Sequence, residues 1–277
     1  MQWRCRHRNI DLSRPIVMGI LNVTPDSFSD GDRYAVLGAA LERAACMARE
    51  GAAVIDVGGE STRPGAAAVD AAVEIARVIP VIAGIAASSD IAISIDTSKP
   101  EVMAAAVAAG ACIVNDVHAL SAPGARAFAA EAQVGVCLMH MKGEPRTMQE
   151  DPRYDDVVGE VYAYLEHERR ACIDAGIARE AIAVDPGIGF GKGLEHNLRL
   201  LRELSRFAAL GAPLLVGVSR KSFIGRILGR PVGERLYGGL GLASLAVALG
   251  ARIIRTHDVA PTREAIGMVS AVLEGKT

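Results

Sequence analysis

Charged residues and glycines follow a short apolar run near the middle of this sequence. The run at residues 181–184 ends in Asp185, and three glycines lie within the next six residues. Glycines let a backbone turn sharply and approach a bound group closely. A second apolar run, 214–218, leads to Ser219 and Lys221. An acid at the end of one strand and a cation at the end of another suit a single binding site for a polar heterocycle and an anion. Two tight turns with solvated charges are the simpler alternative, and neither stretch alone decides between them.

Polar groups recur in this way along the whole chain. Eight apolar runs are present, and nearly every one ends in a polar or charged residue. The groups at these ends are Asn22, Asp56, Asp96, Asn115 with Asp116, His140, Asp185, Ser219 to Lys221, and Arg255 to His257. In a barrel of parallel strands the active site lies at the carboxyl ends of the strands. The regular placement therefore favours one shared site.

Each of these residues also has a simpler interpretation when it is taken alone. Asp96 fits an N-cap of a helix that begins at Lys99, which is the favoured interpretation of that residue by itself. Asn22 and the pair Asn115-Asp116 fit turn residues, and His140 fits a packed core histidine. The functional prediction depends on the whole group.

The group divides into two kinds of chemistry. Asp96, Asn115 and Asp185 can hydrogen-bond the edge of a nitrogen heterocycle, and Lys221 can donate to a ring carbonyl or ring nitrogen. A second set is cationic or amide and suits a diphosphate, with a divalent metal neutralising the remaining charge. Its members are Asn22, Arg63, Arg255 and His257. The sequence has no His/Cys cluster for zinc and no Walker A motif.

Composition and charge exclude several classes of protein. Of 277 residues, 51% are hydrophobic and 22% are charged, so a sizeable core is expected. A formal net charge of -2 argues against a nucleic-acid binder. The basic start lacks the apolar region of a signal peptide, and no apolar run reaches the length of a membrane span. Five scattered cysteines indicate reduced thiols. We therefore expect a cytoplasmic protein that binds neither nucleic acid nor membrane.

Buried strands alternating with helices predict a single domain over residues 1–277, an α/β fold of the (β/α)8 TIM-barrel type. An open doubly wound sheet is the runner-up, but no GxGxxG turn follows the first strand. Residues 1–14 fit a lead-in that forms a hairpin closing one end, and a helix is expected over about 35–50. The predicted strands are 16–22, 53–57, 91–95, 111–114, 135–139, 182–184, 214–216 and 252–254.

Several long motifs in the chain resemble those of the dihydropteroate synthase family. The match runs in the family's order from about residue 15 to the C-terminus. The stretches that carry it are 18–31, 56–65, 94–97, 115–117, 138–143 with 145–149, 185–192, 217–221 and 254–259. The resemblance implies a transferase of folate biosynthesis. It joins 6-hydroxymethyl-7,8-dihydropterin diphosphate to 4-aminobenzoate and yields dihydropteroate and diphosphate. It also implies Mg²⁺, a homodimer and an aminobenzoate position that sulfonamides target.

The resemblance also assigns roles to individual residues. The implied pterin-binding residues are Asp96, Asn115, Met139, Asp185, Phe190, Lys221 and Arg255. The implied diphosphate-binding residues are Asn22, Arg63, Arg255 and His257, and Asn22 also holds the metal. The implied aminobenzoate-binding residues are Phe28, Thr62, Pro64, Phe190, Ser219 and Lys221. The implied catalytic residues are Arg63, Asp185, Lys221 and Arg255.

Two other functions fit a pterin-binding barrel. A methyltransferase domain shares the fold and the pterin pocket but has no use for Arg63. A non-catalytic paralogue predicts loss of the phosphate-binding residues, which are all present. Separately, the apolar segments 240–249 and 266–273 have more apolar surface than one barrel helix face needs. They fit either a homodimer interface or ordinary packing on the barrel.

Overall fold

The fold was analysed in a computed structural model, which describes residues 1–24, 33–61, 68–144 and 147–275. Eight parallel strands form one sheet in the order β8-β7-β6-β5-β4-β3-β10-β9. A parallel bridge between Val184 and Leu214 joins the two ends of this order, so the sheet closes into a barrel. The predicted (β/α)8 barrel is confirmed, and the open doubly wound alternative is wrong.

The barrel strands lie close to their predicted positions. They are β3 (Ile16–Asn22), β4 (Val54–Gly58), β5 (Ala92–Asp96), β6 (Ile113–Asp116), β7 (Gly135–Met139), β8 (Ile182–Asp185), β9 (Leu215–Gly217) and β10 (Ile253–Thr256). Strands β4 and β7 are buried along their whole length, as expected for strands covered on both faces. Six of the strands extend one or two residues beyond their predicted ends, because backbone pairing continues past the last apolar side chain.

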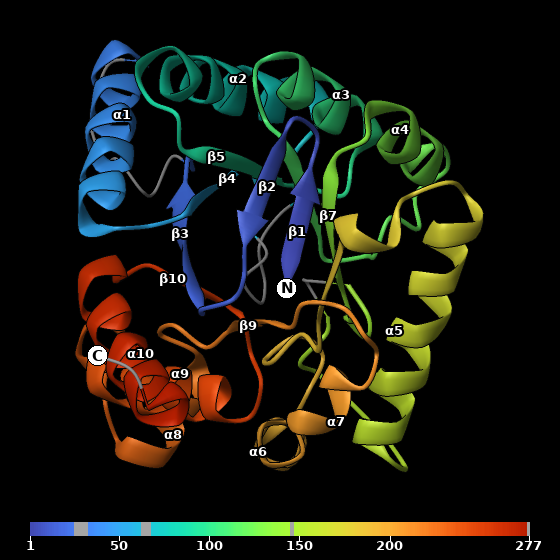
Figure 1. The fold of residues 1–277 in the computed structure, drawn as a ribbon, viewed down its shortest axis with the longest axis vertical. Coiled ribbons are helices and arrows are strands. Elements are labelled where there is room, and N and C mark those ends of the chain that lie inside the picture. The colour runs from blue at the N-terminus through green and yellow to red at the C-terminus, as the bar shows by residue number, and fades with distance from the viewer. Residues whose placement is uncertain (25–32, 62–67, 145–146, 276–277) are drawn as a thin grey trace.

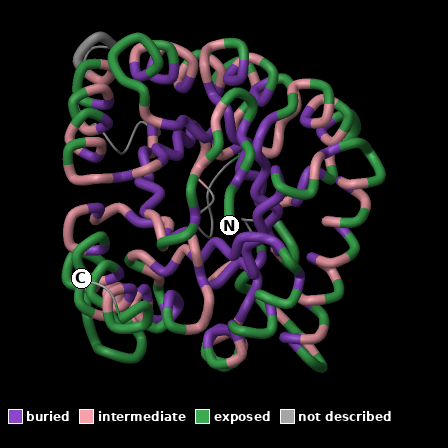
Figure 2. The backbone as a smooth tube through the Cα atoms, viewed as in Figure 1, coloured by how far each residue is buried: buried purple, intermediate pink, exposed green. Residues whose placement is uncertain are grey.

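Helices surround the barrel on its outside (Figure 1). They are α1 (Arg33–Glu50), α2 (Ala71–Ser88), α3 (Pro100–Ala108), α4 (Ala125–Ala132), α5 (Val157–Asp174), α6 (Leu194–Arg202), α7 (Ser205–Ala208), α8 (Ser222–Leu228), α9 (Leu236–Ala248) and α10 (Val259–Glu274). Figure 2 shows buried backbone gathered in the central strands and exposed backbone on the outer turns of the helices. The larger hydrophobic core therefore lies between the strands and the helix ring.

The first residues form the predicted hairpin and close one end of the barrel. Strand β1 (Gln2–Cys5) pairs antiparallel with β2 (Arg8–Asp11). Trp3 is fully buried, and its Nε1 donates a hydrogen bond to the Ala181 carbonyl, 2.9 Å away, just before β8 begins. Trp3, Cys5 and Leu12 pack with residues of the barrel interior in a second core. The hairpin thus covers the amino ends of the strands and leaves the carboxyl ends free for a site.

Helix α2 is the most apolar of the long helices. It is 18 residues long with a mean hydropathy of 1.7, so by length and composition alone it passes as a membrane span. Glu74 and Arg77 interrupt it, so its continuous apolar run is much shorter than the helix. Here α2 packs against α1, α3, β4 and β5, with Val78, Ile82 and Ile85 turned into the core. Its apolar composition is that of a barrel helix whose inner face is buried.

Candidate active site

Arg255 connects two buried carboxylates at the carboxyl ends of the strands. From β10, its Nε donates to Asp56 Oδ2 on β4 and its Nη2 donates to Asp96 Oδ2 on β5, both at 2.6 Å. Asn115, at the end of β6, donates from Nδ2 to the same Asp56 oxygen at 3.0 Å. The parallel sheet places the ends of these strands at one edge, so residues about 200 positions apart meet there.

The charges in this cluster influence one another. Burial raises the pKa of Asp96 to about 7; Arg255 opposes this shift, and Asp56 adds to it. Burial opposes the charge on Arg255, but the two carboxylates outweigh it and raise the pKa of Arg255 above its usual value. Asp56 Oδ1 is buried and has no hydrogen-bond partner among the described residues. Among the described residues the Asp56 carboxylate is therefore held through Oδ2, by Arg255 and Asn115.

A second acid–base pair lies at the ends of β8 and β9. Asp185 Oδ1 accepts a hydrogen bond from the Gly187 backbone at 2.7 Å, and the Lys221 ammonium lies 3.9 Å from the centre of the Phe190 ring. This distance is that of a cation–π contact. Burial raises the pKa of Asp185 to about 6, against the opposing effects of the Gly187 N–H and Lys221. Burial lowers the pKa of Lys221 to about 8, although Asp185 favours its charge.

The glycines after Asp185 are required by close backbone contact with the end of β7. Gly187 has φ of 68°, and a Cβ there would lie 1.9 Å from the His140 carbonyl oxygen. Gly191 has φ of 62°, and its Cβ would lie 2.1 Å from the Lys142 carbonyl oxygen. Met139 is buried beside the same turn, since its Cγ lies 3.3 Å from the Gly187 Cβ position. The turn 186–193 is therefore pressed onto the backbone that follows β7.

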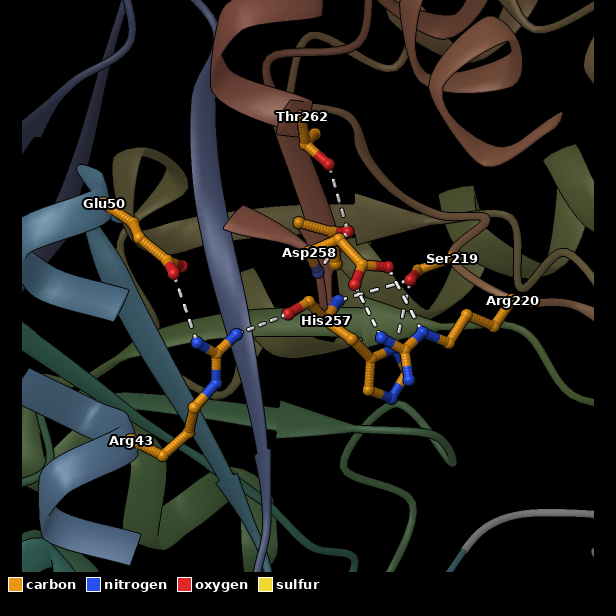
Figure 3. A network of polar contacts seen from close by, with 8 residues as sticks. Arg43, Glu50, Ser219, Arg220, His257, Asp258 and Thr262 are labelled. Atoms are coloured by element: carbon orange, nitrogen blue, oxygen red, sulfur yellow. Dashed lines mark hydrogen bonds and ion pairs between the residues drawn. The ribbon is translucent and has the colours of Figure 1, made fainter. Parts of the chain in front are cut away.

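A polar network joins the ends of β9 and β10 (Figure 3). Ser219 Oγ lies 3.0 Å from His257 Nδ1 and accepts a hydrogen bond from the His257 backbone N–H at 3.2 Å. Arg220 pairs with Asp258 at 2.6 and 3.2 Å, and Arg43 of α1 donates to the His257 carbonyl at 2.8 Å. These contacts fix the loops that present Ser219 and His257.

Asn22, at the end of β3, lies near the Arg255 cluster. Its Oδ1 and the Asp96 Cβ are each 3.6 Å from the Cβ position of Gly58. Within the described part of the chain, no three His, Cys, Asp or Glu residues are grouped as a metal site. Four residues of the predicted site, Phe28, Thr62, Arg63 and Pro64, lie outside the described residues.

Comparisons with known proteins agree on one family. The family described as pterin binding enzyme matches residues 18–257. Dihydropteroate synthase of Escherichia coli strain K12 is 53% identical over 268 residues, which cover 97% of this chain and 95% of that protein. The structure of Yersinia pestis dihydropteroate synthase with a sulfonamide drug complex has a TM-score of 0.94 at 47% identity, and covers 99% of this chain and 100% of that one. The Xanthomonas albilineans enzyme with 4-aminobenzoic acid has a TM-score of 0.93 at 47% identity, with 98% of each chain covered.

The chain belongs to the dihydropteroate synthase family. The resemblance found in the sequence motifs is thereby confirmed, and it extends over nearly the whole chain. A methyltransferase domain is the poorer interpretation, because these relatives and solved structures are synthases.

The structure also corrects the interpretation of Asp96. Helix α3 begins at Pro100, and the residue before it, Lys99, makes no side-chain cap. The Asp96 carboxylate is bound to Arg255, so the N-cap interpretation is wrong. Asp116 does follow the simpler interpretation: it accepts hydrogen bonds from the Ser98 hydroxyl and, at 2.8 Å each, from two backbone N–H groups of the next turn.

Sequence reasoning left the role of Asp56 open and assigned none to Lys192. Asp56 anchors both Arg255 and Asn115 in this dihydropteroate synthase fold. A lone acid within the apolar run 54–57 was the available signal, since a buried carboxylate needs a partner. Lys192 is only 2% exposed and contacts His140. His140 is buried, as the core interpretation predicted, but its partner lies 52 residues away and leaves no local signal.

Proposed function

We propose that this protein catalyses the condensation of 6-hydroxymethyl-7,8-dihydropterin diphosphate with 4-aminobenzoate to give 7,8-dihydropteroate and diphosphate in folate biosynthesis. It is a transferase of the dihydropteroate synthase family. The observation that carries the proposal is the Arg255 cluster. A guanidinium held by Asp56 and Asp96 lies beside the Asn115 amide at the open end of the barrel.

The buried polar groups suit a pterin ring. Pterins carry N–H and amino donors on one edge, and Asp96, Asn115 and Asp185 supply acceptors. Lys221 supplies a donor for a ring carbonyl or nitrogen. The planar face of the Arg255 guanidinium suits stacking on a flat heterocycle. These residues would hold the ring so that its methylene carbon points toward the solvent side of the barrel.

Loss of diphosphate is the demanding step in this scheme. The carbon–oxygen bond breaks as the electron-rich pterin stabilises positive charge at its methylene carbon, and the amine nitrogen of 4-aminobenzoate then bonds to that carbon and releases its proton. Aromatic amines attack in their neutral form, so the reaction needs no strong general base. Cationic and amide groups stabilise the departing diphosphate, and Asn22, Arg63, Arg255 and His257 are proposed for this role.

Mg²⁺ is proposed as the metal that accompanies the diphosphate. Magnesium prefers oxygen ligands and is commonly held by one or two protein oxygens together with substrate phosphates and water. The Asn22 amide oxygen, which lies near Asp96, fits this donor set. Bound there, the ion would neutralise phosphate charge.

The aminobenzoate is proposed to bind above the pterin. Phe190, Lys221 and Ser219 lie at the ends of β8 and β9, and Phe28, Thr62 and Pro64 are assigned to the same pocket by the family resemblance. Sulfonamides mimic 4-aminobenzoate, so we expect them to compete for this position.

A turnover assay tests the proposal. Purified protein is mixed with the pterin diphosphate, 4-aminobenzoate and Mg²⁺, and dihydropteroate and diphosphate are followed together. Formation of both in equal amounts is expected, with competitive inhibition by a sulfonamide. Tight pterin binding without product would instead indicate a non-catalytic paralogue.

We further propose that the protein is a homodimer joined through α8, α9 and α10. Of the eleven exposed large hydrophobic side chains among the described residues, eight belong to these helices or to the segment between α8 and α9, and α9 packs against both α8 and α10. They are Ile227, Leu228, Val232, Tyr237, Leu245, Met268, Val272 and Leu273. A concentration of this kind marks an interaction surface rather than scattered exposure. A cytoplasmic location is proposed with it, since all five cysteines are free thiols.

A further inference from the structure

Lys192 is a buried cation that the condensation scheme does not use. It is 2% exposed, in the turn between β8 and α6. Its Nζ lies 2.9 Å from His140 Nδ1, 2.9 Å from the Phe190 carbonyl oxygen and 3.2 Å from the His140 carbonyl oxygen. An ammonium has three hydrogens to donate, and three acceptors surround this nitrogen.

The ammonium form of Lys192 fits these contacts. It donates to all three acceptors, whereas a neutral amine would donate to the two carbonyl oxygens and accept from a His140 Nδ1–H; the nearby Asp185 carboxylate favours the ammonium. Burial lowers the pKa of Lys192, and the nearby Asp185 opposes that shift. Burial, and then the charge of Lys192, lower the pKa of His140 to about 3. His140 is therefore neutral, and toward the ammonium form of Lys192 its Nδ1 is the acceptor.

Side chains from other elements hold the turn in place. Asn197 of α6 accepts from the Gly189 N–H at 2.6 Å and donates to the Lys192 and Gly193 carbonyls at 3.0 and 2.8 Å. The Tyr154 hydroxyl donates to the Gly191 carbonyl at 2.8 Å. Lys192 and Asn197 thus fasten the turn from inside, where it has no strand partner.

This turn supports two residues of the proposed site. The Phe190 carbonyl is bound by Lys192, and the Phe190 ring contacts the Lys221 ammonium at 3.9 Å. The Lys221 Cδ lies 3.1 Å from the Cβ position of Gly189, so the lysine stem rests directly on the turn. A shift of the turn would therefore move Phe190 and Lys221 together.

We propose that Lys192 is a positioning residue for the condensation. Held by His140, it fixes Phe190 and Lys221 against the bound substrates, and its charge helps to keep Asp185 ionised. The inference rests on the proposed function, since it names a further residue of the same site.

The charge effect makes a pH profile informative. Three cations act on Asp185: Lys221 before α8, Lys192 in the turn and Arg255 on β10 each lower its pKa, while burial raises it to about 6. The Gly187 N–H also favours the ionised form of Asp185. On β7, the Cys137 thiol interacts with the same carboxylate but stays protonated, because burial and then Asp185 raise the pKa of Cys137. Without the Lys192 charge the pKa of Asp185 rises, so the acidic limb of the profile moves toward alkaline pH.

The matched experiment compares Lys192→Met with Lys142→Met. Each variant removes a lysine near His140, but Lys142 is exposed. Among the described residues its side chain contacts Tyr154, Arg153 and Glu160. For Lys192→Met we expect kcat/KM for the pterin diphosphate to fall about 10- to 100-fold, with the acidic limb displaced to alkaline pH. Lys142→Met should retain the wild-type profile.

A second variant covers failure of Lys192→Met to fold. His140→Phe keeps the aromatic packing on Tyr164, whose ring centre is 4.9 Å away, and removes one acceptor of the ammonium. It should lower kcat/KM in the same direction. Wild-type kinetics and an unchanged pH profile in either folded variant would overturn the inference. Failure of both variants to fold would also overturn it, because Lys192 and His140 would then serve stability alone.

Wild-type turnover separates this inference from the proposed function. If the wild type makes no product, the proposed function fails, and the pH dependence of pterin diphosphate binding by calorimetry then replaces the kinetic profile. An alkaline shift of that binding curve in Lys192→Met would still support the role of Lys192; superimposable curves would refute it.

Discussion

Arg255 satisfies two buried acids with one side chain. Its guanidinium donates through separate nitrogens to Asp56 and Asp96, and these contacts occupy one edge of the planar group. The flat face is left for a ligand, which a lysine at the same place could not offer. Arg255 therefore both neutralises the carboxylates of Asp56 and Asp96 and forms part of the binding surface.

Removing this guanidinium should disturb stability as well as activity. Arg255→Ala leaves two buried carboxylates without their cation, so we expect the free energy of unfolding to fall by about 3 kcal/mol and turnover to be lost. Urea denaturation and the turnover assay measure the two effects. Arg153→Ala is the control, because its pair with Asp151 is 85% and 65% exposed, so its loss should leave the free energy of unfolding nearly unchanged. Equal stability losses in the two variants would contradict this account.

The buried carboxyls should also make the substrate-free protein less stable as pH rises. Burial raises the pKa of Asp185 to about 6 and that of Asp96 to about 7, from 3.8 for an exposed carboxyl. Protonation then favours the folded state: the added stability is complete below 3.8 and is lost as pH rises through the folded-state values. Between about pH 5 and about pH 8, we expect the free energy of unfolding of Asp185→Asn to fall by about 1 kcal/mol less than that of the wild type, as measured in urea titrations. Parallel curves for the two proteins would argue against a raised pKa.

Individual residues were predictable where they stood at strand ends. Asp96, Asn115 and Asp185 could be grouped from the sequence because apolar runs predict buried strands, and a parallel barrel brings the carboxyl ends of its strands together. What each carboxylate binds was not predictable, since Asp96 meets Arg255 from a position 159 residues away. Local chemistry alone favoured the wrong partner, a helix cap.

At the scale of elements, the turn between β8 and α6 shows how little freedom the backbone has. Its glycines are pressed against the carbonyls of His140 and Lys142. The sequence indicated a sharp turn through its glycines, but the reason for them is contact with another segment, which only the folded chain reveals.

Two glycines with similar backbone angles should respond differently to a methyl group. Gly187 has φ of 68° and Gly211 has φ of 66°, but a Cβ at Gly187 would meet the His140 carbonyl oxygen at 1.9 Å, whereas nothing lies within 4 Å at Gly211. Gly187→Ala should lower the free energy of unfolding by about 3 kcal/mol or more and should reduce turnover. Gly211→Ala should lower the free energy of unfolding by only about 1 kcal/mol, from backbone strain. Thermal unfolding compares them; a smaller loss for Gly187→Ala would show that the turn can relax.

The whole molecule combines a closed barrel with one apolar side. The barrel was predictable because eight buried strands alternate with helices, and the runs in α9 and α10 already suggested surplus apolar surface. Which of those side chains are exposed was not predictable, because α9 is apolar nearly all round. Tyr237 is 84% exposed and Val272 76%, although both lie in apolar segments.

A charge placed on this side should separate the proposed dimer. Light scattering of the wild type should give twice the 29.0 kDa of one chain, and Val272→Asp should shift the mass toward a single chain. Val73→Asp on α2 is the control, since Val73 is exposed but lies away from α8, α9 and α10. A wild-type mass near 29.0 kDa would refute the dimer.

The hairpin at the start of the chain has a consequence for synthesis on the ribosome. Trp3 is synthesised before its hydrogen-bond partner Ala181, which follows 178 residues later. The strand walls that enclose Trp3, Cys5 and Leu12 include Leu215 and Ile253, which are made later still. The three apolar side chains therefore stay exposed until nearly all of the barrel has been translated. The hairpin is made before most of the barrel but is among the last parts to reach its place, and nascent chains halted before β10 should bind holdase chaperones through residues 1–12.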